Sequence, residues 1–166
     1  MRALRGDDAD ALHPILSDAA LMTWWSSAPQ ASVETTRDYI TPRASDGPWR
    51  SWAITLDGSD TAIGWVSAGL RRAKVIELGY LLGRAHWGGG IAREAASGLL
   101  DYLFEVEGMR RVFADIDPDN RGSVALIEAL GFKLEGVLRE EWETHIGVRD
   151  SAIYGLLARE WAQRQH

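Results

Sequence analysis

The sequence contains no cysteine, and this absence removes several kinds of chemistry at once. Without thiols there can be no disulfide, no thiolate metal site and no cysteine nucleophile, although an acyl-enzyme route through serine stays formally open. The four histidines are scattered along the chain without the spacing of metal ligands. We therefore expect no metal site.

Long apolar runs and an excess of positive charge are also missing. No run of about 18 apolar residues could span a bilayer, and the beginning "MRALRGDDADAL" lacks the apolar core of a signal peptide. The net charge of −6 argues against a broad nucleic-acid footprint, which is normally basic, and favours cationic small molecules or basic peptide ends. We expect a cytoplasmic protein that binds neither nucleic acid nor membrane.

What is present is the composition of an ordinary folded protein. The chain has 166 residues, of which 46% are hydrophobic and 25% charged. This length suits one domain with a substantial core, and we find no internal repeat, linker or low-complexity segment. We predict one domain over residues 1–166, present as a monomer or a homodimer.

Helix signals come early in the chain. Residues 8–17 and 31–41 are predicted helices, with Ser32 as the N-cap of the second helix and Pro42 at its end. Pro14 makes the first helix short or kinked. The connection between them, "ALMTWWSSAP", carries adjacent tryptophans, Trp24 and Trp25. These rings either close the core beneath the loop or form the wall of a substrate pocket.

Strands and further helices follow in a regular order. The segments "RSWAITL", "TAIGWVSAGL" and "VIELGYLL" are predicted antiparallel strands, and Asp57-Gly58 predicts a hairpin turn between the first two. A helix then runs to Gly108, followed by the strand "RRVFADI", the helix "RGSVALIEAL" and strands around "FKLEGVLREEW" and "RDSAIYGLLA". We predict an α/β (α+β) fold with one sheet. The core-facing stripe of the helix before Gly108 is Ala92, Ala95, Ala96, Leu99, Leu103 and Val106.

Three consecutive glycines, Gly88, Gly89 and Gly90, precede that helix in "LGRAHWGGGIAREA". The first amides of a helix have no acceptor within the helix, and the helix dipole adds positive charge there. Glycines would let a phosphate approach these amides without meeting a Cβ atom. Neither common nucleotide-binding motif fits, because no Lys-Ser/Thr pair follows and no G-x-G-x-x-G is present. The alternatives are a flexible loop or close helix packing.

Several motifs in order resemble a known family. "WGGGIA" opens a helix, and "DNRGSVALIEALGF" follows the next strand. Together with "IGWVS", "IELGYLL" and "GVRDSAIYGLLAREW", they resemble the GNAT superfamily of N-acetyltransferases, and within it the RimJ/RimL-like branch. The superfamily's turn usually begins with Gln or Arg, whereas this chain has Trp87 there, as is common in this branch.

The resemblance implies a single GNAT domain whose mixed, mostly antiparallel sheet has splayed middle strands flanked by helices. It also implies acetyl-CoA as the acyl donor. The turn amides would hold its pyrophosphate, the end of the strand "VIELGYLL" would bind the pantetheine arm and the acetyl carbonyl, and Asn120 would bind the same arm. Asn120 could instead be only an N-cap. The residues implied to contact acetyl-CoA are Leu81, Leu82, Trp87, Gly88, Gly89, Gly90, Ile91, Ala92 and Asn120.

Acetyl transfer needs a proton acceptor, because a lysine-like amine has a pKa of about 10.4 and is mostly protonated at neutral pH. Glu77 is the candidate base, since an unpaired carboxylate in an apolar strand binds a proton more readily. The alternative is an ion pair with Arg71, Arg72 or Lys74. The resemblance puts Ser123 near the sulfur of the coenzyme as the acid, ahead of Tyr80, although Ser123 could simply bond the backbone.

We therefore expect an acetyl-CoA-dependent N-acetyltransferase, an acyltransferase that transfers groups other than amino-acyl groups. The primary amine would attack directly, without a covalent enzyme intermediate, and Trp24 and Trp25 would contact the acceptor. The acceptor could be a protein N-terminus, a polyamine, an amino sugar or another small amine. Glu140, Glu141 and Glu143 either recognise a cationic acceptor or form a solvated face. The competing hypothesis is a non-catalytic acyl-CoA-binding sensor or interaction module.

Overall fold

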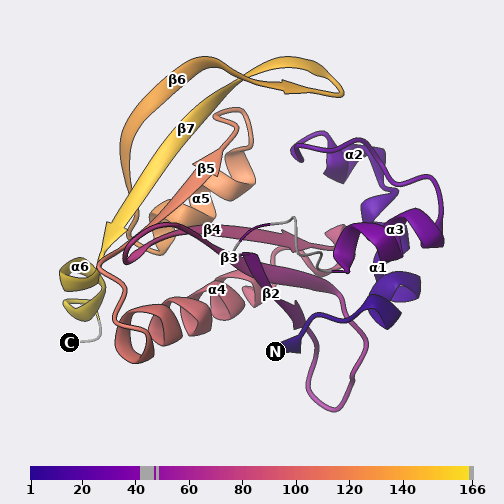
Figure 1. The fold of residues 1–166 in the computed structure, drawn as a ribbon, viewed down its shortest axis with the longest axis horizontal. Coiled ribbons are helices and arrows are strands. Elements are labelled where there is room, and N and C mark those ends of the chain that lie inside the picture. Colours follow the sequence, from indigo (N-terminus) through magenta and orange to yellow (C-terminus); the bar gives the residue numbers. More distant parts are fainter. Residues whose placement is uncertain (42–46, 48, 165–166) are drawn as a thin grey trace.

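The computed structural model describes residues 1–41, 47 and 49–164, and seven strands of this part form one sheet (Figure 1). The β4–β5 pair is parallel, and the other neighbouring pairs are antiparallel. The predicted mixed, mostly antiparallel sheet is confirmed. In spatial order the strands are β1 (Arg2–Ala3), β2 (Trp49–Ile54), β3 (Gly64–Arg72), β4 (Val75–Leu82), β5 (Arg111–Ile116), β7 (Gly147–Leu157) and β6 (Lys133–Thr144).

Helices cover both faces of the sheet, because alternate residues of the central strands are apolar on both sides. Ile76 and Leu78 of β4 belong to the core cluster with α4 and α5, whereas Leu81 belongs to the cluster with α1 to α3. We call these two sides the α4 face and the α1 face. The helices are α1 (Ala9–Leu16), α2 (Ala19–Met22), α3 (Val33–Ile40), α4 (Ile91–Asp101), α5 (Arg121–Ala129) and α6 (Ala158–Ala162).

Both early helices are present at the predicted positions. The Ser32 hydroxyl accepts a hydrogen bond from the Thr35 amide and so caps α3 as predicted. Pro14 lies inside α1, which ends two residues later at Leu16. The predicted role of Pro42 falls outside the described residues. The sequence patterns did not predict three short elements, β1, α2 and α6, since two to five residues carry too little periodicity to be recognised.

The predicted hairpin between β2 and β3 is present, and Asp57-Gly58 lies in a turn where the Ser59 amide donates to the Leu56 carbonyl oxygen. The connection is longer than the predicted turn "DGSD", because the last pair of β2 and β3 joins Ile54 to Gly64 and nine residues lie between them. Arg2 and Arg5 both contact the carboxylate of Asp60, at 2.5 Å each. The loop is therefore anchored to the N-terminal segment instead of continuing the strand ladder.

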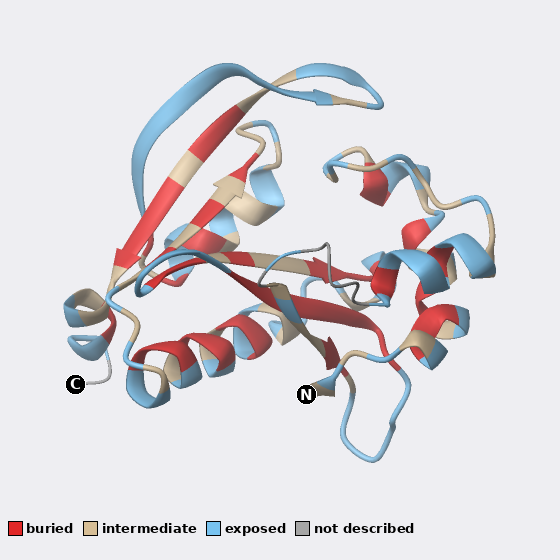
Figure 2. Ribbon diagram, viewed as in Figure 1, coloured by how far each residue is buried: buried red, intermediate tan, exposed pale blue. Residues whose placement is uncertain are grey.

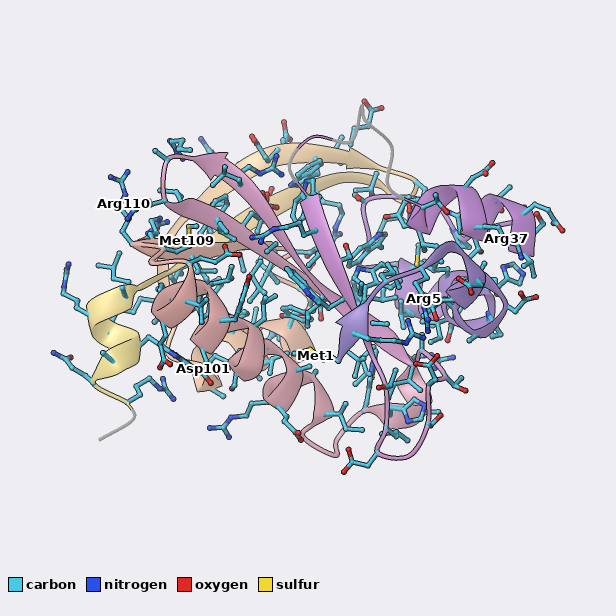
Figure 3. The ribbon with its side chains drawn as sticks, turned by 60° about the horizontal axis from the view of Figure 1, so that its bottom comes forward. Met1, Arg5, Arg37, Asp101, Met109 and Arg110 are labelled. Atoms are coloured by element: carbon cyan, nitrogen blue, oxygen red, sulfur yellow. The ribbon has the colours of Figure 1, made fainter. Side chains whose placement is uncertain are left out.

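The helix after the glycines is longer than α4 alone, because a π-helical turn, Tyr102–Val106, continues it to Gly108. Most of the predicted stripe is buried, and Leu100 and Phe104 join it. Val106 is an exception at 71% exposure, since the π-helical turn shifts the register of the last residues. Figure 3 turns the α4 face forward, where Asp101 at the end of α4 accepts a hydrogen bond from the Trp161 indole of α6.

The middle strands diverge, as the resemblance implied. β4 and β5 are paired from Val75 to Glu77 and from Arg111 to Phe113, and no further residues are paired before these described strands end. At the far edge, β6 is exposed along nearly its whole length, and the β6–β7 hairpin arches beyond the body of the protein (Figure 2). The split between β4 and β5 thus opens the centre of the sheet.

Candidate active site

One cavity of about 1430 Å³ extends from the α1 face through the split to the glycine turn. Its lining comes from α2 and α3, from the ends of β4 and β5, from the first turns of α4 and α5, and from the tip of the β6–β7 hairpin. The cavity therefore connects the predicted coenzyme-binding turn with the predicted acceptor-binding tryptophans.

The glycine turn is open, as expected for an anion cradle. Gly88 and Gly90 both have a φ of +80°, in the left-handed region that favours glycine. A Cβ atom at any of the three glycines would meet no atom within 4 Å. Gly90 is the N-cap of α4 and provides no side-chain hydrogen bond, so the first amides of this eleven-residue helix keep their donors available. Ile91 and Ala92 supply two of these amides.

Trp87 has a structural contact at this turn. Its indole Nε1 donates to the carbonyl oxygen of Leu82 at 2.8 Å, while 54% of the residue stays exposed. The bond joins the end of β4 to the start of the glycine turn. Much of the Trp87 ring remains accessible and lines the cavity beside the glycine turn.

The backbone of β4 presents alternate residues to the split. The Gly83 amide donates to the Ile63 carbonyl oxygen, just before β3. Because amides alternate in direction along an antiparallel strand, the amide of Leu81, two residues earlier, also points toward β3, at Trp65. The amides of Tyr80 and Leu82 point the opposite way, toward the side where β5 has separated. Of the predicted pair Leu81 and Leu82, the structure thus gives an open amide only to Leu82, and sequence reasoning had not included the Tyr80 backbone.

Three predicted polar residues meet where α5 begins. The Asn120 side chain accepts a hydrogen bond from the Ser123 amide at 3.2 Å and is therefore an N-cap, with its NH₂ group left for another partner. The Tyr80 hydroxyl crosses the split and donates to the Ser123 carbonyl oxygen at 3.3 Å. Burial raises the pKa of Tyr80 to about 12. Within the described chain the Ser123 hydroxyl has no hydrogen-bond partner.

Glu77 is not the unpaired carboxylate that the sequence pattern suggested. The Arg71 Nε donates to Glu77 at 2.6 Å, so the alternative of an ion pair is the one observed. The Arg71 guanidinium also stacks 5.1 Å from the ring centroid of Trp49. A Cβ on Gly69 would lie 2.6 Å from the Trp49 ring, so only glycine leaves room for this packing. Arg71 thus fixes the side chain of Glu77, which is the last β4 residue that pairs with β5.

Aromatic rings form the wall on the α1 face. The Trp25 indole donates to the Tyr39 hydroxyl at 2.7 Å and packs edge-on against the buried Trp65, with ring centroids 5.8 Å apart. Trp24 is 36% exposed, and both neighbouring tryptophans line the cavity. Trp25 therefore satisfies both predicted alternatives, because it closes the core and borders the cavity.

Asp115 is a cavity residue that sequence reasoning missed. It lies on β5 two residues after the last β4–β5 pair, and it accepts hydrogen bonds from the Trp142 indole and the Ser151 hydroxyl. A signal existed, because a carboxylate interrupts the apolar strand "RVFADI" just as Glu77 interrupts its own strand. By contrast, the three glutamates of β6, Glu140, Glu141 and Glu143, are exposed and do not line the cavity.

The described part of the chain has neither a metal-binding cluster nor a membrane-spanning helix. No group of three or more histidine, aspartate or glutamate side chains is arranged to hold a metal ion. No helix there is long and apolar enough to cross a membrane.

Comparison with known proteins identifies relatives along nearly the whole chain. A model of the acetyltransferase (GNAT) domain matches residues 1–133. The "Uncharacterized N-acetyltransferase p20" of Bacillus licheniformis is 31% identical, over 98% of this chain and 94% of that protein. The spermidine N(1)-acetyltransferase of Escherichia coli K12 is 24% identical, over 86% of this chain and 76% of that protein.

A solved structure has the same fold. The spermidine N-acetyltransferase of Vibrio cholerae, in complex with CoA and spermine, superimposes with a TM-score of 0.82. The alignment covers 97% of this chain and 96% of that chain, at 22% sequence identity. At this identity the likeness concerns the fold, and the bound molecules are properties of the neighbour.

Proposed function

Because this chain belongs to the acetyltransferase (GNAT) family, whose members use acetyl-CoA, we propose that it acetylates the primary amine of a small molecule by direct attack. The continuity of one cavity, from the bare glycine turn through the strand split to the tryptophan wall, carries this proposal. A direct transfer needs the thioester and the amine in one space. This cavity has the glycine turn for the coenzyme at one end and the tryptophan wall for the amine at the other.

The coenzyme would bind by main-chain groups. In the proposal, the amides at Gly88 to Ala92 bind the pyrophosphate, since α4 begins there without a side-chain cap. The amides of Tyr80 and Leu82, turned toward the split, bind the pantetheine arm and the acetyl carbonyl oxygen. The free NH₂ group of Asn120 adds a donor from the opposite side. These contacts need no charged side chain, and Trp87, which is bonded to the Leu82 carbonyl oxygen, lines the cavity beside the turn and would contact the coenzyme there.

The chemistry follows in one transfer. Glu77, directly or through water, takes a proton from the ammonium group, and the free amine attacks the thioester carbonyl. A β4 amide stabilises the oxyanion, the C–N bond forms and the C–S bond breaks. As the intermediate collapses, the nitrogen releases its second proton to solvent, and the Ser123 hydroxyl donates its proton to the departing thiolate and regains one from solvent. Ser123 is favoured over Tyr80 because the Tyr80 hydroxyl already donates to a carbonyl oxygen.

The test is the release of free thiol from acetyl-CoA in the presence of a panel of amines. We expect release that depends on an amine, and we expect Glu77→Gln to lower kcat about 100-fold and to change the pH dependence of kcat. The matched control is Glu105→Gln, which removes an exposed carboxylate on the π-helical turn. An unchanged rate and pH profile in Glu77→Gln would mean that another group is the base.

The same assay separates the competing function. A non-catalytic acyl-CoA sensor would bind acetyl-CoA in calorimetry yet release no thiol with any amine. Glu77 and Ser123 would then have no task near the thioester. Protein N-termini and polyamines belong in the panel, because spermidine is the named substrate of the Escherichia coli relative.

Several finer expectations stay proposals. We infer a RimJ/RimL-like branch from the motif order, a single domain over residues 1–166 from the one sheet, and a cytoplasmic location. Light scattering of the purified protein distinguishes a monomer from a homodimer.

A further inference from the structure

Asp115 differs from the other carboxylates around the strand split. By alternation with Val112, Ala114 and Ile116, which pack on the α4 face, Asp115 points to the α1 face. Asp115 lies two positions after Phe113, the last β5 residue that pairs with β4, and it lines the cavity. Its carboxylate therefore lies on the acceptor side of the opening through which the coenzyme would reach.

The hydrogen bonds of Asp115 orient its charge without neutralising it. The Ser151 hydroxyl donates to Oδ1 at 2.5 Å, and the Trp142 indole donates to Oδ2 at 3.0 Å. Both donors are neutral, and no ion pair joins Asp115 to a cation of the described chain. Neighbouring carboxylates are compensated: Glu77 pairs with Arg71, and Asp117 pairs with Arg149. A cationic group from a ligand would complete the Asp115 site.

A bulge in β6 delivers the indole that holds Asp115. The β6–β7 register changes between the pairs Leu138–Ser151 and Trp142–Arg149, where three β6 residues face one β7 residue. Glu140 within this bulge has a φ of +54°, and its amide donates to the Asp150 carboxylate. Asp150 and Ser151 are neighbours on β7, so their side chains lie on opposite faces of the strand. Because a bulge re-aims the strand, Trp142 reaches across β7 to β5.

Aromatic rings also line this end of the cavity, together with polar side chains such as Thr35 and Asp38. Trp49 lies flat over Gly69, and Trp25 is fixed by its bond to Tyr39. Rings held this rigidly bind an apolar body at little entropic cost. An aliphatic polyamine has no flat apolar surface to stack on these rings and would contact them less fully than a ring-bearing body. The aromatic residues lining this end are Trp24, Trp25, Tyr39, Trp49 and Trp65.

We propose that the acceptor is a monocationic primary amine with an apolar, ring-bearing body, and that Asp115 binds its ammonium group. The tryptophan wall packs on the body and holds the nitrogen at the strand split. This inference rests on the proposed acetyl transfer, but it assigns binding to Asp115 and proton removal to Glu77. It also favours such an amine over a polyamine, although polyamines are the substrates named for some relatives.

The experiment compares 2-phenylethylamine with spermidine as acceptors and measures kcat and KM for each. We expect kcat/KM to be at least about tenfold higher for 2-phenylethylamine in the wild-type protein. In Asp115→Asn the KM for this amine should rise at least about tenfold, while the KM for acetyl-CoA stays unchanged. The asparagine can accept from Trp142 and donate to the Ser151 hydroxyl, so the fold keeps its hydrogen bonds.

Two further variants keep the result interpretable. Trp142→Phe removes the indole donor and keeps an aromatic ring, and it should raise the amine KM by a smaller factor than Asp115→Asn. Asp57→Asn removes one negative charge from an exposed loop residue that does not line the cavity, so it controls for net charge and should leave KM unchanged.

The outcomes separate the two proposals. Amine-dependent thiol release with spermidine preferred, or with an unchanged amine KM in Asp115→Asn, overturns the Asp115 proposal and leaves acetyl transfer intact. Binding of acetyl-CoA without turnover of any amine overturns the proposed function itself. A fall of kcat in Asp115→Asn without a change in amine KM would make Asp115 a proton acceptor, contrary to its proposed role.

Discussion

At the scale of single residues, ion pairing with arginines decides which carboxylates are available to bind the ammonium group of a substrate. Arg71 occupies Glu77, and Arg149 joins Asp117 to Asp119. A paired carboxylate has less to offer an incoming ammonium group, since its charge is already compensated. The neutral donors around Asp115 therefore matter more for acceptor binding than the number of acidic residues in the chain.

Asp8 is the carboxylate whose replacement we expect to cost the most stability. It is 6% exposed and accepts hydrogen bonds from Arg2 and from the Arg5 amide. Burial raises its pKa, but the hydrogen bonds from Arg2 and Arg5 outweigh burial and bring the pKa below its ordinary value of 3.8. The resulting stabilisation is present above pH 3.8 and is lost as the pH falls through the lower, folded-state pKa.

We therefore expect Asp8→Asn to lower the free energy of unfolding by about 3 kcal/mol at pH 7, because Arg2 loses its buried partner. The difference from the wild-type protein should shrink as the pH falls below about 4. Urea unfolding at pH 7, 5 and 3.5 measures both effects. Asp10→Asn is the control, since Asp10 is exposed and meets Arg37 only at 3.4 Å. A difference that persists unchanged at pH 3.5 would contradict this explanation.

Ser123 and Tyr80 can be ranked as acids by kinetics. We expect Ser123→Ala to lower kcat by about 10- to 100-fold, because its hydroxyl is the donor free to reach the thiolate. Tyr80→Phe should have a smaller effect, since burial keeps the pKa of Tyr80 at about 12 and its proton is already donated to a carbonyl oxygen. Steady-state kcat with saturating acetyl-CoA gives the comparison. The reverse ranking would assign the acid to Tyr80.

At the scale of elements, the start of α4 owes its openness to conformations that glycine adopts readily. Gly88 and Gly90 have positive φ, whereas Gly89 between them does not. A side chain on Gly89 therefore adds bulk or charge to the turn without backbone strain and without a clash. This position lets the proposed anion cradle be tested separately from folding.

Gly89→Asp should weaken CoA binding about tenfold more than Gly89→Asn, because the two side chains have the same shape and only one repels the pyrophosphate. Isothermal calorimetry at two salt concentrations measures the difference, which should decrease at higher salt. Both variants should unfold at nearly the wild-type temperature. Equal CoA affinities for the two variants would mean that the turn does not bind the pyrophosphate.

Strand β4 and the β6–β7 hairpin have separate tasks. β4 packs on the core clusters of both faces and turns its last backbone amides toward the split, while the β6–β7 hairpin brings Trp142 back over the sheet. The bulge around Glu140 allows an exposed edge strand to contribute a hydrogen bond to β5. A regular β6 ladder would direct the indole elsewhere.

At the scale of the whole molecule, the cavity joins parts that otherwise contact one another only through the sheet. Its lining includes α3 on one side and α5 on the other. A coenzyme bound across the split would connect both halves, so binding should oppose unfolding of the entire protein.

We expect CoA at 100 times its Kd to stabilise the protein by about 2.7 kcal/mol. For a protein of this size the gain corresponds to an increase in Tm of about 5–10 °C. Differential scanning fluorimetry over a series of CoA concentrations measures the shift. Gly89→Asp at the same CoA concentration should shift less, and an absent shift in the wild-type protein would argue against coenzyme binding.

Local patterns in the sequence were enough to predict the order of helices and strands, the N-cap at Ser32 and the bare turn before α4. These features depend on neighbouring residues and on periodicity, which one chain contains by itself. The family followed from the same motifs, because their order and spacing lie within single elements and turns. The turn at Asp57-Gly58 was predicted as well, but not the nine-residue length of the β2–β3 connection, which Arg2 and Arg5 anchor through Asp60 from a distant segment.

Only the tertiary structure decided which carboxylates of the cavity wall form ion pairs and in which direction its donors point. Glu77 became an ion-pair partner because β3 returns Arg71 beside it, and Asp115 became the uncompensated carboxylate because the β6 bulge brings Trp142 to it. The same holds for the split, which depends on where β4 and β5 stop pairing. Trp142 and Asp115 are 27 residues apart, and even the Arg71–Glu77 pair, six residues apart, depends on the register of β3 and β4, which no local pattern contains.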